Sequence, residues 1–225
     1  MTLLGGLPYD TSTVSYLTLL AYMLLLLLGD CAGGIPAARL LLRPQSFVLI
    51  RSGWKRWFWL VLRRCCLSAL AFCGIALIPA LIRFPTRTTV CAWLLFTLHI
   101  EMVAAVQVLL TALFENAAAA MVPVLSVQMI SILLSGRLPG SWAVLLPGNW
   151  GSLFRTAEYE LPRLSEALSR FSSVEGATVS DYDSFVRSQL HGGFPLWPAI
   201  ALNLAVLLPT ALFAWRLVRR RHNRA

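Results

Sequence analysis

Residues 90–134 read VCAWLLFTLHIEMVAAVQVLLTALFENAAAAMVPVLSVQMISILL, and they decide the fold class of the chain. Two long apolar runs, 90–114 and 117–134, meet at the polar pair Glu115-Asn116. Each run is close to the roughly 20 apolar residues that a helix needs to cross a bilayer. The sequence therefore predicts a hairpin of two membrane-spanning helices joined by a very tight turn, for which Asn is a favoured residue.

Three further apolar stretches extend this prediction to the whole chain: 11–28, 65–82 and 195–215. Of the 225 residues, 58% are hydrophobic and 13% are charged, and the mean hydropathy is +0.71. A soluble domain is about 25% charged, so this chain could not cover a soluble surface with polar groups. Lipid accepts only a backbone whose hydrogen bonds are satisfied internally. We therefore predict an all-α polytopic membrane protein, a single membrane domain with about five transmembrane helices.

The first stretch is expected to remain in the protein as a span. A secretory signal peptide has a basic start, and no Lys or Arg precedes Arg39. The sequence Leu28-Gly29-Asp30-Cys31 superficially resembles a lipoprotein cleavage box, but an acidic residue directly before the cysteine argues against cleavage.

Basic residues indicate how the chain is oriented. The net charge is +9, and most of the 19 Lys and Arg residues lie in two regions, 35–64 and 216–224. Because Lys and Arg mark cytoplasmic loops, both regions are expected on the cytoplasmic side, which places the N-terminus outside. The segment 135–194 is roughly neutral and is expected outside, with an amphipathic helix over 155–171. This charge pattern suits a membrane surface, and no nucleic-acid partner is expected.

Residues 35–64 read IPAARLLLRPQSFVLIRSGWKRWFWLVLRR, with apolar and basic residues interleaved. Pro44 divides the segment, and the part after it has apolar residues near helical spacing. One interpretation is an amphipathic connector that lies on the anionic inner leaflet. The other is that the connector also docks onto a soluble partner at the cytoplasmic face.

Two motifs resemble those of a known family, the type-2 ABC transporter permeases. The connector is similar to the segment through which these permeases contact their ATPase; the residues concerned are Arg43, Pro44, Arg51, Trp54, Lys55 and Arg56. The stretch Pro147-Gly148-Asn149-Trp150 resembles one found in related bacterial permeases, including those beside peptide-antibiotic immunity ATPases. In that family this region forms short re-entrant helices at the outer face.

The resemblance implies a function. The chain would be the membrane subunit of an ABC exporter, in the bacterial inner (plasma) membrane, and it would move a peptide or antibiotic. It would bind no cofactor itself, since ATP and Mg²⁺ belong to a separate ABC ATPase. A second permease subunit, identical or different, would complete the transporter. Such permeases normally have six helices, whereas five are found here, so the alternative is a non-transporting membrane adaptor that recruits a soluble partner through its connector.

His99 and Glu101 are ionisable groups inside the third apolar stretch. Such groups are costly in a membrane and usually face the interior of the bundle. One interpretation is that they line a pathway or a gate, and the other is that they are packed and paired between helices. Two residues apart, they point about 200° from one another around a helix. No HExxH, GxSxG, P-loop or CxxC motif occurs, so no catalytic residue or metal site is predicted, and a membrane enzyme using these two residues is the weakest hypothesis.

Overall fold

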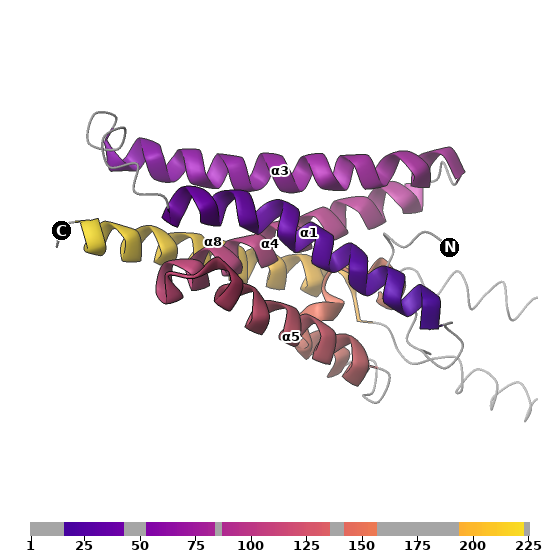
Figure 1. The fold of residues 1–225 in the computed structure, drawn as a ribbon. Helices are drawn as coiled ribbons and strands as arrows, with labels where there is room; N and C mark the ends of the chain where they lie inside the picture. Colours follow the sequence, from indigo (N-terminus) through magenta and orange to yellow (C-terminus); the bar gives the residue numbers. More distant parts are fainter. Residues whose placement is uncertain (1–15, 43–52, 84–86, 136–141, 157–193, 223–225) are drawn as a thin grey trace, which may run out of the picture.

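The computed structural model describes residues 16–42, 53–83, 87–135, 142–156 and 194–222 (Figure 1). Five long helices account for most of them: α1 (Tyr16–Leu42), α3 (Trp54–Arg83), α4 (Arg87–Phe114), α5 (Ala117–Ser135) and α8 (Leu196–His222). All five are long and apolar enough to cross a membrane. These ranges contain no strand, only an isolated bridge between Thr156 and Phe194. The predicted class, an all-α polytopic membrane protein, is confirmed.

Helix α4 is the centre of the bundle. Most of its residues are buried, and each of α1, α3, α5 and α8 packs against it. Helix α1 also packs against α3 and, less extensively, against α5, whereas α3 and α8 make few contacts with one another (Figure 1). Small residues at Ala104, Ala105 and Ala112 let the neighbouring helices come close to α4.

Successive helices run in opposite directions, so the two ends of the bundle differ. One end gathers the end of α1, the start of α3, the α4–α5 turn and the end of α8 (Figure 1). We call it the basic end, because its described residues include Arg39, Lys55, Arg56, Arg216, Arg219 and Arg220. The opposite end gathers the start of α1, the end of α5 and the start of α8.

Helix α1 continues to Leu42, well beyond the end predicted at residue 28. Gly29 and Asp30, which directly follow the predicted end, instead face α4. A Cβ on Gly33 would lie 2.9 Å from the Cβ of Ala104, so the backbone of α1 packs directly against α4 at this position. Asp30 is only 1% exposed. The polar residues are therefore internal contacts of a longer helix, because α4 supplies their surroundings.

Helix α3 begins at Trp54, inside the connector that was predicted over 35–64. The carbonyl oxygen of Gly53 accepts hydrogen bonds from the amides of Arg56 and Trp57, at 3.0 and 3.3 Å, and Gly53 takes a φ of 75° that favours glycine. With 30 residues α3 is about 45 Å long, which exceeds a hydrocarbon core of about 30 Å. Most of the predicted connector thus belongs to α1 and α3, and only 43–53 separates the two helices.

The α4–α5 turn is as tight as predicted, and its two residues have different structural roles. Glu115 takes the left-handed conformation, with a φ of 55°. Asn116 instead caps α5, because its Oδ1 accepts hydrogen bonds from the amides of Ala118 and Ala119 at 2.9 and 3.2 Å. The exposed start of α5 needs an acceptor for these amides, and the Asn side chain provides it.

Candidate functional site

Three short 3₁₀ helices form a capping segment, residues 142–156, at the end opposite the basic end. They are η3 (Trp142–Leu145), η4 (Pro147–Asn149) and η5 (Leu153–Arg155). Side chains hold the segment in this shape: Asn149 Nδ2 donates to the Ala143 carbonyl oxygen at 2.8 Å, and Trp150 Nε1 donates to that of Val144 at 2.6 Å. The segment packs on α4 and α5. The motif at 147–150 is therefore part of a compact, buried structure.

Two glycines allow the capping segment to lie directly on the helices. A Cβ on Gly148 would lie 2.7 Å from the Gln128 carbonyl oxygen of α5. A Cβ on Gly151 would lie 2.8 Å from Cγ and Cδ2 of His99 on α4. Real Cβ atoms do not come this close to backbone or ring atoms, so neither position has room for a side chain. The capping segment and His99 are thus in direct contact.

His99 joins three helices through its ring. It is fully buried, its Nδ1 lies 3.1 Å from Oδ1 of Asn203 on α8, and its Nε2 lies 3.1 Å from Oε1 of Gln128 on α5. Asn203 Nδ2 donates to the carbonyl oxygens of Trp150, at 3.1 Å, and Ala199, at 2.9 Å. One polar network therefore ties α4, α5, α8 and the capping segment together.

The partners of Asn203 determine which nitrogen of His99 carries a proton. Because Asn203 Nδ2 faces two carbonyl oxygens, its Oδ1 must be the atom that faces His99. An oxygen acceptor requires an N–H, so Nδ1 of His99 is the donor. Nδ1 of His99 therefore carries a proton. Nε2 faces Oε1 of Gln128.

The capping segment also buries a cation. Arg155 is 1% exposed, and its Nη1 donates to Oδ1 of Asn149. The guanidinium is close enough to act electrostatically on the hydroxyl of Tyr22, a buried residue of α1. Arg155 was predicted to start an amphipathic helix over 155–171, but it ends η5, and residues 157–171 lie outside the described residues.

A second polar contact crosses the interface between α1 and α4. With its amide nitrogen facing α1, Gln107 donates to Oδ1 of Asp30 at 2.9 Å and to the Asp30 carbonyl oxygen at 3.2 Å. Gly34 makes this possible, since a Cβ there would occupy the position of the Gln107 amide. Oδ2 of Asp30 is buried and has no partner among the residues described. This pair explains why an acidic residue is tolerated inside α1.

Glu101 points toward α3, away from the His99 network, as the spacing of the two residues predicts. Cys66 of α3 lies near its carboxylate. Oε1 of Glu101 is buried and finds no partner within the described ranges. The side chain as a whole is half-buried. Glu101 is therefore an intramembrane carboxylate with incomplete internal pairing.

The residues predicted to couple to an ATPase fall into two groups. Arg43, Pro44 and Arg51 lie outside the described residues. Lys55 and Arg56 are exposed on the first turn of α3, which starts at Trp54, at the basic end. The structure does not bring this group near His99 or Glu101, which lie farther along the bundle.

Several buried polar residues were not predicted as site residues: Asp30, Gln107, Gln128, Arg155 and Asn203. Each except Arg155 is a lone polar residue inside an apolar run, and that was the available signal. Within the described part of the chain no three His, Cys, Asp or Glu residues are grouped so that they could hold a metal ion. No protein-family model, curated protein or solved structure matches this chain.

Proposed function

We propose that the chain is the membrane subunit of an ABC exporter energised by a separate ATPase, and that it exports a peptide or antibiotic. The observation that supports this most directly is the continuity of α3. This helix runs without a break from Trp54 to Arg83, so its exposed first turn and Cys66 belong to one rod. Lys55 and Cys66 are separated by about 16 Å along the helix axis.

A continuous helix can transmit a movement at its first turn along its whole length. The basic first turn of α3 would contact the ATPase at the cytoplasmic face, together with Arg43, Pro44 and Arg51 of the preceding segment. ATP and Mg²⁺ would bind the ATPase, and closure of the ATPase dimer would shift α3 along α4. That shift would act directly on the contact between Cys66 and Glu101. His99 and the capping segment would hold the outer end of the bundle during the movement.

The proposed assembly contains two permease subunits, identical or different, which together would enclose a path. The basic end would face the cytoplasm of a bacterial cell, in agreement with the rule that Lys and Arg mark cytoplasmic loops. The capping segment, including Pro147, Gly148, Asn149 and Trp150, would then face outward. Lipid would surround the remaining apolar surface.

Co-purification from native membranes in mild detergent tests this proposal. The wild type should bring down an ABC ATPase. Lys55→Glu/Arg56→Glu should lose the ATPase, because charge reversal removes the positive charge of the first turn of α3. Arg219→Glu/Arg220→Glu is the matched control, since these exposed arginines lie at the same end on α8. If no ATPase accompanies the wild type, the exporter proposal is wrong.

The second candidate is a membrane adaptor without transport activity. Five candidate spans in the described residues, in place of the six usual for the resembled family, favour it. An adaptor would lose its soluble partner in the Lys55→Glu/Arg56→Glu variant, and the partner would not be an ATPase. Identification of the co-purifying protein by mass spectrometry therefore separates the two functions.

A further inference from the structure

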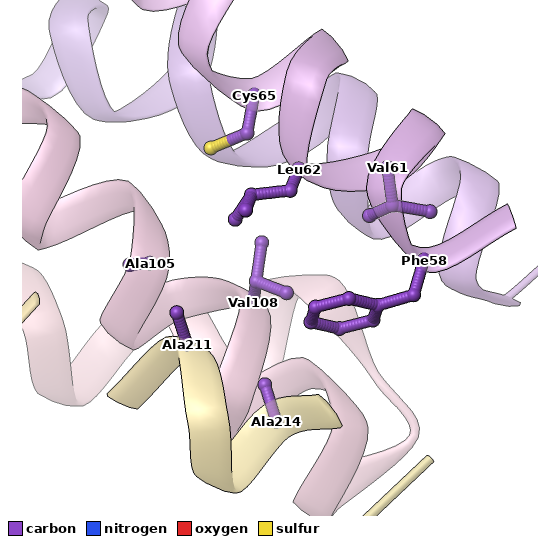
Figure 2. Close-up of a pocket in the computed structure, with 8 residues that line it drawn as sticks. All are labelled: Phe58, Val61, Leu62, Cys65, Ala105, Val108, Ala211 and Ala214. Atoms are coloured by element: carbon purple, nitrogen blue, oxygen red, sulfur yellow. The ribbon is translucent and has the colours of Figure 1, made fainter. Parts of the chain in front are cut away.

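Helix α3 has a packed face and an uncovered face near the basic end. Figure 2 shows the packed face, from which four side chains point toward α4 and α8: Phe58, Val61, Leu62 and Cys65. Residues on the opposite side of the helix are exposed: Trp59, Leu60, Arg63, Arg64 and Leu67. We call this second side the open face of α3, because none of the described helices covers it.

The open face carries a depression of about 480 Å³ that is accessible from outside the bundle. The described residues that line it share one stripe of the helix: Leu60, Arg63, Arg64, Leu67 and Ser68. The Ser68 hydroxyl already donates to the Arg64 carbonyl oxygen, at 2.7 Å. Among these side chains the two guanidiniums are therefore the groups that can donate to a ligand. Neither forms an ion pair with a carboxylate of the described residues.

The two arginines lie where α3 would leave the hydrocarbon core. Arg63 is twenty positions from Arg83, the last residue of the helix, and this is about 30 Å along the axis. A typical hydrocarbon core is also about 30 Å thick. No charged residue lies between Arg64 and Arg83. Trp59, which is 68% exposed and one turn closer to the basic end, suits the headgroup level. The depression therefore matches the level of the lipid phosphates.

Two guanidiniums at the edge of the hydrocarbon core need an anionic partner, because an unpaired charge there is costly. A lipid phosphate is available at this level, and Arg can bind it through two parallel N–H···O bonds. The exposed Leu60 and Leu67 offer an apolar surface to the acyl chains. Helix α3 contains no acidic residue, so the same face of a second copy of the chain could not neutralise the arginines. The charge on this face thus favours an anionic lipid.

We propose that Arg63 and Arg64 form a binding site for the phosphate of an anionic phospholipid. The guanidiniums donate to the phosphate oxygens in the depression, and an acyl chain runs along Leu67 and Leu70 toward the centre of the bilayer. A zwitterionic lipid also has a phosphate, but the arginines repel its ammonium group, so the site prefers a lipid with a net negative charge. This site does not depend on the exporter function proposed above.

Native mass spectrometry of the full chain in mild detergent measures the affinity for the first lipid bound. The wild type should bind phosphatidylglycerol at least about tenfold more tightly than phosphatidylcholine with the same acyl chains. Arg63→Gln/Arg64→Gln should weaken phosphatidylglycerol binding at least about tenfold, since charge-assisted contacts are lost. Arg219→Gln/Arg220→Gln is the matched control. It removes the same charge from exposed positions of α8 at the same end, and it should bind as the wild type does.

Photolabelling locates the bound lipid. A phosphatidylglycerol with a diazirine near the glycerol should label residues 57–70 of α3 in the wild type. Labelling confined to other helices, equal affinity for the two lipids, or an equal loss in the α8 control would overturn the proposal. A dimer of the chain that Arg63→Gln/Arg64→Gln dissociates, with lipid affinity unchanged, would also overturn it, because a second copy would then cover the open face.

Two features of the design keep the result interpretable. If Arg63→Gln/Arg64→Gln fails to fold, the lipid preference and the labelling pattern of the wild type decide. Because neither experiment contains an ATPase, the outcome is independent of the co-purification result.

Discussion

Nδ1 of His99 lies 3.1 Å from Oδ1 of Asn203, and this contact joins the central helix α4 to α8 inside the bundle. The same Asn203 amide donates to the carbonyl oxygen of Trp150, so one side chain also holds the capping segment. Both residues are fully buried. Asn203 therefore ties α8 both to α4 and to the capping segment.

Asn203→Ala should destabilise the protein by about 1–3 kcal/mol, because it leaves the His99 N–H and the Trp150 carbonyl oxygen buried without partners. The measurement is the midpoint of thermal unfolding in detergent. Leu204→Ala is the matched control, since the neighbouring Leu204 is partly exposed on the lipid side of α8. Equal midpoints for the two variants would mean that the network does not hold α8.

Gly151→Ala should cost about 1–3 kcal/mol, since a Cβ at this position collides with the His99 ring and the segment must move away. Gly74→Ala in α3 is the opposite case. No atom lies within 4 Å of a Cβ built there, so the better helix former should stabilise the protein by about 0.5–1 kcal/mol. If the unfolding midpoint of Gly151→Ala is as high as that of Gly74→Ala, the close contact at Gly151 is contradicted.

Asp30 and Gln107 should behave as a coupled pair. Asp30→Ala or Gln107→Met alone leaves one buried polar group unpaired, and each should cost about 1–3 kcal/mol. The double variant removes both groups, so its cost should be clearly less than the sum of the two. Unfolding free energies of the four proteins give the coupling, and strict additivity would show that the two side chains do not interact.

Thiol labelling tests the proposed orientation. In a background without the five native cysteines, Glu115→Cys marks the α4–α5 turn and Trp142→Cys marks the capping segment. An impermeant maleimide should label Trp142→Cys on intact spheroplasts. It should label Glu115→Cys only after the membrane is opened, because the turn lies at the basic end. The reverse pattern would place the basic end outside.

The sequence by itself determined the number of spans, the tight α4–α5 turn and the concentration of positive charge near the ends of α1, α3 and α8. These features follow from apolar run length and from the order of charges along the chain, and both are local properties. The separation of His99 from Glu101 was also predictable, because helical geometry alone directs residues two apart to different sides.

Only the tertiary structure decided where the polar residues find partners. The first span was predicted to end at residue 28, and nothing local reveals that Gln107 pairs with Asp30, which lies 77 positions earlier in the chain. Asn203 meets His99 across 104 positions and Trp150 across 53. In an apolar interior a polar group needs a partner wherever the fold can supply one. Apolar patterning fixes which segments are helices, but these pairings depend on which helix faces meet, and that is a property of the assembled bundle.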